Sequence, residues 1–230
     1  VSTAVPSGQA TVLLCFLVLH RMRTTTRTAL PGVLWAGDPP AAAERIIPAL
    51  LSRLRSALGP DVLPPRGDPQ LRLPEPAHVD IEEARRAVHT ADAAIDARDW
   101  SAAWVAARIA LNTSQREFLP GVDLPWAAAE RESLKDIRWR SWEAVGEAGL
   151  GLGGAEIVSS RRAGRELMRE EPLRESGYRL AMRAALAQGN PAEAVQIYEF
   201  LRGRLVDALG VGPGPETREL FAQVAARLEG

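Results

Sequence analysis

The feature that most constrains this 230-residue chain is the uneven distribution of its prolines. Eleven of the 17 prolines lie in residues 1–76, and six of those lie in residues 60–76. Because proline fixes φ and removes a backbone N–H donor, the 60–76 stretch cannot form a helix. After Val79 the sequence is rich in Ala, Arg and Glu with few helix breakers, which is typical of helices. We therefore expect two domains, residues 1–76 and residues 77–230, joined near residues 74–80.

The distribution of charge changes at the same boundary. Residues 1–76 contain 8 Arg and 5 acidic residues, whereas the remainder contains 20 basic and 24 acidic residues. The whole chain has a formal net charge of −1, so no global charge directs it to nucleic acid or to lipid. The expected smaller domain is mildly basic and the expected larger domain is acidic.

Several classes of function lack the residues that they need. One cysteine excludes an intramolecular disulfide framework, and the three histidines show no metal-ligand spacing. The longest apolar run, Val12–Leu19, has eight residues where a membrane-spanning helix needs about 20, so we expect a buried helix there. The glycine-rich segments 149–154 and 210–215 lack the Lys-Ser/Thr of a phosphate-binding loop and are predicted to be turns. No nucleophile elbow is present. We predict no enzyme, no cofactor, no metal and no membrane association.

The first half is predicted to form three helices, at residues 9–20, 27–35 and 39–58. The third is predicted to begin at Asp38-Pro39, since an N-cap followed by proline is a good start signal. Its apolar stripe is formed by Ile47, Leu51, Leu54 and Leu58. At about 100° per residue, the side chains that project away from the stripe are those of Arg45, Ser52, Arg53 and Ser56, while Arg55 lies on its flank.

The residues after this helix are compatible with a small β-hairpin. Val62-Leu63 and Leu71-Arg72-Leu73 are the predicted strands, with Arg66 and Arg72 at or near the tip. A helix-turn-helix followed by a basic hairpin is a docking geometry for DNA, in which one helix enters the major groove and the hairpin reaches adjacent phosphate. A solvated helix surface is the alternative explanation for these arginines.

The second half contains an internal repeat of 34 residues. Ser160, Gly164 and Leu167 recur as Ala194, Tyr198 and Leu201, and 34 residues is the period of the tetratricopeptide helical hairpin. An earlier repeat is phased through Ala103, Ala107 and Ala110, with about 23 extra residues around 113–135. Such hairpins bury their apolar faces only by stacking on one another, so we expect a helical array. The tryptophans expected mostly inside that stack are Trp100, Trp104, Trp126, Trp139 and Trp142.

Five stretches carry a resemblance to a known family. Residues 34–40 (Leu-Trp-Ala-Gly-Asp-Pro-Pro) and 51–59 (Leu-Ser-Arg-Leu-Arg-Ser-Ala-Leu-Gly) resemble the winged-helix segment of the antibiotic regulatory protein family (SARP, AfsR-like). Residues 126–131, 171–175 and 208–216 resemble the bacterial transcriptional activation domain of the same family, which is an all-helical tetratricopeptide-like array. The resemblance covers roughly residues 9–230.

The resemblance implies a mainly α fold, with a truncated winged helix-turn-helix domain, a small β wing and an all-α tetratricopeptide-like array. It implies a cytoplasmic bacterial transcription regulator that binds double-stranded promoter DNA. The helical array would activate transcription through the transcription machinery or another protein, or would form a homo-oligomer. The family's recognition helix corresponds to residues 39–58 here. The implied DNA-binding residues are Arg45, Ser52, Arg53 and Arg55, with Arg66 and Arg72 in the wing.

Three departures from the family pattern motivate an alternative function. The family's domain begins with a β-sheet, but only eight residues precede the first predicted helix here. The wing has Gln70-Leu71 where the family has Gly-Tyr, and Pro48 falls inside the predicted recognition helix, where proline costs about 3 kcal/mol unless the helix kinks or restarts. The alternative is a protein-interaction scaffold whose degenerate winged helix no longer binds DNA.

Overall fold

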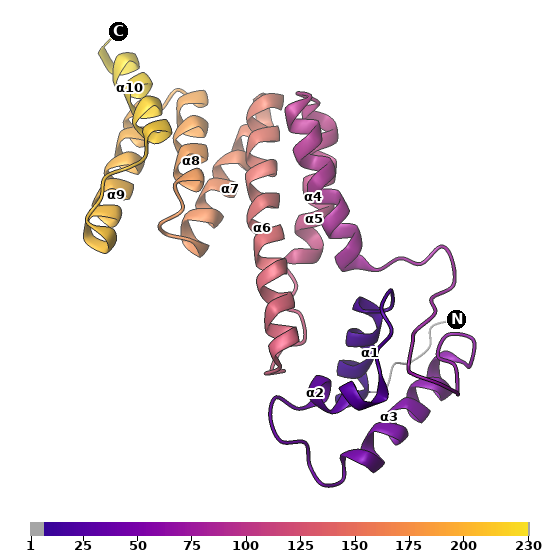
Figure 1. Cartoon of the computed structure of the whole chain (residues 1–230). Coiled ribbons are helices and arrows are strands. Elements are labelled where there is room, and N and C mark those ends of the chain that lie inside the picture. Colours follow the sequence, from indigo (N-terminus) through magenta and orange to yellow (C-terminus); the bar gives the residue numbers. More distant parts are fainter. Residues whose placement is uncertain (1–6, 230) are drawn as a thin grey trace. The chain divides into compact units, whose positions relative to one another are not determined.

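The computed structural model describes residues 7–229 and is mainly helical in that part of the chain (Figure 1). The helices of the first half are α1 (Gln9–Leu19), the short 3-10 helix η1 (Arg27–Ala29), α2 (Leu30–Leu34) and α3 (Ala43–Leu58). Those of the second half are α4 (Asp80–Asp96), α5 (Trp100–Ser114), α6 (Pro125–Leu152), η2 (Gly154–Glu156), α7 (Ile157–Glu170), α8 (Glu175–Ala187), α9 (Pro191–Leu209) and α10 (Pro215–Glu229). The mainly α fold expected from the sequence is confirmed. Over residues 7–229 no segment forms a β-strand.

The chain forms two compact units. Unit 1 comprises residues 1–78 together with 117–132, and unit 2 comprises residues 79–116 together with 133–230. Unit 1 is therefore built from two separate stretches of sequence, and the second includes the first residues of α6. This second stretch coincides with the extra residues that interrupt the helical repeat.

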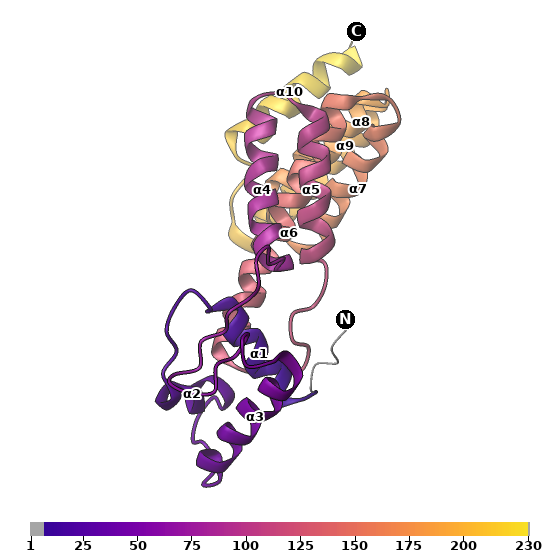
Figure 2. The ribbon, with the colours of Figure 1, turned by 90° about the vertical axis from the view of Figure 1, so that its right-hand side faces the viewer.

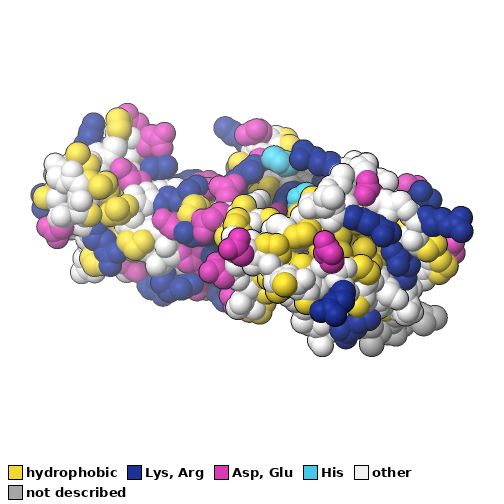
Figure 3. All heavy atoms as spheres, turned by 60° about the horizontal axis from the view of Figure 1, so that its bottom comes forward, with side chains coloured by type: hydrophobic (Ala, Val, Ile, Leu, Met, Phe, Trp, Pro, Cys, Tyr) yellow, Lys and Arg dark blue, Asp and Glu magenta, His cyan; other side chains and the backbone are white. Residues whose placement is uncertain are grey.

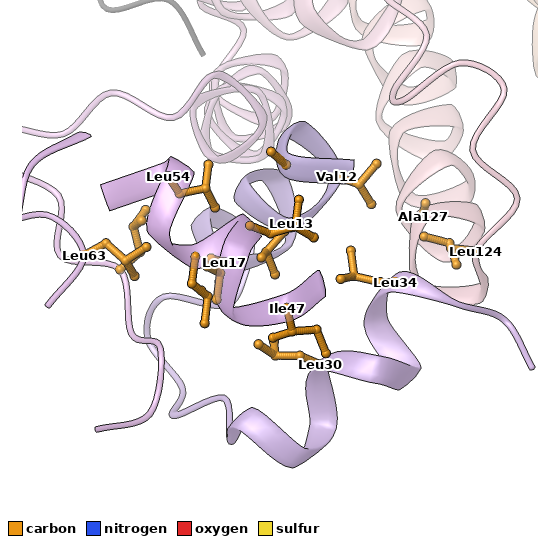
Figure 4. Packing of buried hydrophobic residues seen from close by; sticks show 14 residues of the cluster. Val12, Leu13, Leu17, Leu30, Leu34, Ile47, Leu54, Leu63, Leu124 and Ala127 are labelled. Atoms are coloured by element: carbon orange, nitrogen blue, oxygen red, sulfur yellow. The ribbon is translucent and has the colours of Figure 1, made fainter. Parts of the chain in front are cut away.

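Unit 1 has a single apolar core formed by α1, α2, α3 and the residues around them (Figure 4). Leu13 and Leu17 of α1 meet Leu30 of α2 and Leu54 of α3, and each of these four side chains is at most 1% exposed. The 117–132 stretch contributes Leu124 and Ala127, and its Trp126 donates from Nε1 to the Val33 carbonyl oxygen at 2.9 Å. The prediction that Trp126 belongs to the helical array is therefore wrong.

Two elements of unit 1 differ from their predicted bounds, and local proline chemistry accounts for the second difference. The helix predicted over residues 27–35 is η1 followed by the short helix α2. The helix predicted to begin at Asp38-Pro39 begins instead at Ala43. A residue that precedes proline is disfavoured in the α region, so Pro40 keeps Pro39 out of the helix. A turn closed by Ala43 N–H and the Pro40 carbonyl, at 2.8 Å, then leads into α3.

The predicted β wing does not form a strand pair in the described residues. One backbone hydrogen bond connects its two segments, from Arg72 N–H to the Val62 carbonyl oxygen at 2.7 Å. Three of the intervening residues, Pro64, Pro65 and Pro69, have no N–H to donate to a ladder. The segment is consequently an irregular loop, which we call the 64–72 loop.

Unit 2 is an array of helices that lie side by side in antiparallel hairpins (Figures 1 and 2). The repeated residues occupy equivalent buried positions on its second helices: Ala103, Ala107 and Ala110 on α5, Ser160, Gly164 and Leu167 on α7, and Ala194, Tyr198 and Leu201 on α9. Helices α4 to α8 share one core, which contains Trp142. A further core cluster, formed by α8, α9 and α10, contains Tyr198.

Two of the family-like stretches contact each other in unit 2. Both carboxylate oxygens of Glu175 accept from the Gly214 backbone N–H, at 2.9 and 3.0 Å. The Tyr178 hydroxyl donates to the Pro172 carbonyl oxygen at 2.9 Å. The Glu175 contact joins the start of α8 to the turn before α10, and the Tyr178 contact joins α8 to the α7–α8 turn, so the two stretches have a structural role in the last hairpins.

The glycine-rich segment 149–154 is not the turn that its sequence suggests. Gly149 and Gly151 lie in the last turns of α6, and only residues 153–154 reverse the chain. A Cβ on Gly151 would lie 2.2 Å from the Trp100 ring, and one on Gly149 would lie 2.4 Å from Ser160 Oγ. These two glycines therefore allow α6 to approach α5 and α7 closely. Within residues 7–229, none of the helices is both long enough and apolar enough to cross a membrane.

Candidate nucleic-acid interface

Helix α3 is strongly amphipathic, which fixes the side that it presents to solvent. Its buried side is formed by Ala43, Ile47, Leu50, Leu51 and Leu54. Pro48 lies in this helix without interrupting it. The Pro48 ring is exposed, and so is Glu44, whose carbonyl loses the hydrogen bond that proline cannot donate. Solvent can therefore satisfy that carbonyl, and the helix continues unbroken to Leu58.

The side chains predicted to project outward from α3 do so. Arg45, Ser52, Arg53 and Ser56 are all exposed. The guanidinium groups of Arg45 and Arg53 make no side-chain hydrogen bond or ion pair with any described residue. The two residues are eight positions apart, or about 12 Å along the helix axis. Helix α3 thus presents two unpartnered cations and a hydroxyl on its exposed side.

Arg55 has a different environment. It is half-buried, and its Nε donates to the Pro64 carbonyl oxygen at 3.2 Å. This position agrees with the flank position calculated from helical periodicity. The hydrogen bond joins α3 to the 64–72 loop and leaves only the terminal guanidinium nitrogens of Arg55 for another partner.

The 64–72 loop carries the other two predicted site residues. Arg66 and Arg72 are exposed, and neither side chain has a hydrogen bond or ion pair to the described residues. Arg72 lines a hollow of about 740 Å³ together with Arg21. The structure therefore brings Arg72 near Arg21, a residue that was not among the predicted site residues.

Two arginines of unit 1 were missed as site candidates. Arg21 and Arg27 belong to the run Arg-Met-Arg-Thr-Thr-Thr-Arg at residues 21–27, whose three arginines follow the first helix. That clustering is the signal that could have identified them. The Arg27 Nε donates to the Gly67 carbonyl oxygen at 3.0 Å, so this arginine also contacts the 64–72 loop.

The formal charges of unit 1 sum to zero. The 117–132 stretch contains one Arg and four acidic residues, so it cancels the excess of three cations in residues 1–78. Figure 3 shows several basic side chains spread over one face of unit 1, separated by neutral and hydrophobic side chains. Attraction of an anion to this unit must therefore come from the position of individual arginines. Among the described side chains, no group of three or more His, Cys, Asp or Glu could hold a metal ion.

Comparisons with known proteins identify the family. The family model of the bacterial transcriptional activator domain matches residues 79–225. The regulatory protein AfsR of Streptomyces coelicolor is 35% identical over 223 residues, which is 96% of this chain and 22% of AfsR. The transcriptional regulatory protein EmbR of Mycobacterium tuberculosis is 29% identical over 239 residues, 96% of this chain and 59% of EmbR.

A solved structure has the same fold. It is that of Mycobacterium tuberculosis EmbR in complex with a low-affinity phosphopeptide, with a TM-score of 0.75 and 24% identity over 97% of this chain and 61% of that one. The chain thus spans about a fifth of AfsR and about three fifths of EmbR. The resemblance drawn from its sequence stretches is confirmed. The chain belongs to the bacterial transcriptional activator domain family.

Proposed function

We propose that the chain is a transcription regulator that binds double-stranded promoter DNA through unit 1. In this proposal residues 1–76 are the winged-helix DNA-binding domain, and residues 77–230 are the activation domain. The observation that carries it is the exposed side of the continuous helix α3, where the side chains of Arg45, Ser52 and Arg53 have no partner among residues 7–229. The relatives AfsR and EmbR are named as regulatory proteins, which supports the same function.

In this proposal each exposed side chain makes a different contact with DNA. The B-DNA major groove is about 12 Å wide and admits one α-helix. In that groove Arg53 would read a base edge, because a guanidinium bonds two acceptors of guanine at once. Arg45 and Ser52 would contact phosphates or the groove edge, and Arg66 and Arg72 of the 64–72 loop would contact adjacent phosphates. Arg55 would contribute at the edge of this surface through its terminal nitrogens.

The test uses the full chain and a target selected from a random double-stranded DNA library. We expect binding that weakens steeply with salt, because phosphate contacts release counterions. Arg53→Ala should lose about 1–3 kcal/mol of discrimination at one base position. Arg86→Ala is the matched control, since Arg86 is an exposed helical arginine of unit 2 without a side-chain partner among the described residues. Equal losses in the two variants, or undetectable binding of the unmodified chain to DNA, would overturn the proposal.

The activation domain offers a groove for a protein partner. The groove has a volume of about 800 Å³ and is lined by α6, α8 and α10. Four leucines are among its lining residues, together with both members of the ion pairs Glu147–Arg183 and Arg179–Glu216. We propose that a segment of the transcription machinery, or of a second copy of this chain, occupies this groove.

The second candidate function is a protein-interaction scaffold that no longer binds DNA. It is favoured by the equal numbers of acidic and basic residues in unit 1. The two functions differ in their need for DNA. A scaffold should bind purified RNA polymerase holoenzyme as tightly without DNA as with it, and the double variant Arg45→Ala/Arg53→Ala should bind unchanged. A regulator should lose promoter-dependent recruitment in that variant.

A further inference from the structure

The 64–72 loop is held by hydrogen bonds on both sides of Arg66. Before it, the Pro64 carbonyl oxygen accepts from Arg55 Nε at 3.2 Å. After it, the Gly67 carbonyl oxygen accepts from Arg27 Nε at 3.0 Å, and Asp68 Oδ1 accepts from the Arg27 backbone N–H at 3.1 Å. From this arrangement we propose that Asp68 is a positioning residue, which fixes the loop so that Arg66 is held ready for a phosphate. The inference rests on the proposed DNA-binding function.

Burial anchors the loop at its two ends. Leu63 and Leu71 are 0% and 3% exposed, and both belong to the core of unit 1. Between these anchors residues 65–68 and Gln70 are exposed, and Gly67 turns the chain next to Arg66 with a φ of 80°. A loop fixed in this way has already lost most of its conformational entropy, so contact with a ligand by Arg66 costs less.

The hydrogen bond of Asp68 is explained by the start of helix η1. Arg27 is the first residue of η1, so its backbone N–H has no partner inside that helix. The Asp68 carboxylate accepts from this N–H across 41 positions of sequence. Loss of the carboxylate oxygen would remove one of the two hydrogen bonds between Arg27 and the loop and would leave the backbone donor to water.

The direction in which DNA affinity changes when Asp68 is replaced distinguishes a positioning role from a purely electrostatic one. Asp68 is an anion on a surface proposed to meet phosphates, so its carboxylate repels the ligand. If charge alone mattered, any neutral replacement of Asp68 would tighten DNA binding. If positioning matters, a replacement that cannot accept the hydrogen bond should weaken binding although the repulsion is gone.

Asp68→Asn and Asp68→Ala provide the matched pair, because they remove the same charge and only asparagine keeps the Oδ1 acceptor. We expect Asp68→Asn to bind the selected DNA at least as tightly as the unmodified chain. Asp68→Ala should bind about three- to tenfold more weakly than Asp68→Asn, the loss of one net hydrogen bond. Its salt slope should fall by about one, since the Arg66 phosphate contact is lost. In an Arg66→Ala background the two variants should bind equally.

A second measurement needs no DNA. Trypsin cleaves after arginine, and the bond that follows Arg66 leads to glycine and not to proline. We expect cleavage after Arg66 to be at least about threefold faster in Asp68→Ala than in Asp68→Asn, because the rate of cleavage follows local opening. Equal cleavage in the two variants would overturn the positioning role.

The two measurements also separate the possible failures. Faster cleavage of Asp68→Ala, with no DNA binding by the unmodified chain, would leave the restraint of the loop in place and refute its proposed ligand. Unequal DNA binding that persists in the Arg66→Ala background would show that Asp68 acts through another residue, which would refute the inference while DNA binding stands.

Discussion

Tyr178 shows how one buried polar side chain links stability to pH. Its ring is fully buried between α7 and α9, and its hydroxyl has a partner in the Pro172 carbonyl oxygen. Burial disfavours the charged phenolate and raises the pKa of Tyr178, while the nearby Arg204 lowers it by a smaller amount. The neutral phenol is thus the form that the folded protein stabilises.

We expect this tyrosine to make the protein sensitive to alkaline pH. Above the ordinary tyrosine pKa of about 10, the unfolded chain loses a proton that the folded protein keeps, so the free energy of unfolding falls as the pH rises. Tyr178→Phe should cost about 1 kcal/mol at neutral pH through the lost hydrogen bond and should flatten the fall above pH 10. Urea unfolding between pH 7 and pH 11 measures both effects. An unchanged alkaline slope in the variant would contradict this role.

At the residue scale, helical periodicity predicted which way side chains point, but it did not predict which groups they contact. The exposed side of α3 and the flank position of Arg55 both follow from the spacing of apolar residues. The partner of Arg55 could not be predicted, because the Pro64 carbonyl lies in an irregular loop whose path depends on the buried Leu63 and Leu71. The Arg27–Asp68 contact spans 41 positions and has no local signal.

At the scale of elements, small residues decide how closely the helices of unit 2 pack. A Cβ on Gly164 of α7 would lie 2.8 Å from the Ala181 nitrogen and from the Gly177 carbonyl oxygen of α8. Gly177 in turn faces Leu167 Cβ and the Gly164 carbonyl oxygen. The backbones of α7 and α8 therefore lie against each other where the two helices cross. The atoms that a new side chain would meet belong to a helix and cannot rotate away.

We therefore expect Gly164→Ala to destabilise unit 2 by about 1–3 kcal/mol, the usual cost of overpacking, despite the better helix propensity of alanine. Gly203→Ala on α9 is the control, since a Cβ there would meet nothing within 4 Å. That control should be neutral or stabilising by up to about 1 kcal/mol. Thermal unfolding of both variants tests the expectation, which fails if they shift the midpoint in the same direction.

The presence of a helix was easier to predict from the sequence than the residues at which it begins and ends. The buried helix at residues 9–20 is present as α1, and the 34-residue repeat corresponds to equivalent buried positions on α7 and α9. Boundaries failed where two local signals competed. At residues 38–43 the N-cap signal was overridden by consecutive prolines, and at residues 149–152 the glycines serve helix packing and not chain reversal.

At the scale of the whole molecule, each unit has its own core. Trp126 contributes to that of unit 1 through its bond to Val33 and its edge contacts with Phe16 and Phe118, at ring-centroid distances of 5.3 and 6.0 Å. Leu201, fully buried with Tyr178 and Leu205, contributes to that of unit 2. Sequence composition indicated a single boundary near residue 77, whereas residues 117–132 return to unit 1. Composition could not reveal this return, because the stretch is short and its apolar residues resemble those of the array.

We expect heating to produce two unfolding transitions. Trp126→Ala should lower the midpoint of one transition through a loss of about 3 kcal/mol, while Leu201→Ala should lower the other by a similar free energy. Differential scanning calorimetry of the two variants and the unmodified chain makes the assignment. A single transition that both variants shift equally would show that the units unfold together.

The discontinuity of unit 1 has a consequence for its synthesis. A ribosome releases α1, α2 and α3 long before Leu124, Trp126 and Ala127 emerge, and the α4–α5 hairpin leaves the exit tunnel in between. The nascent amino-terminal helices therefore keep part of their apolar surface uncovered until about residue 132 has left the exit tunnel.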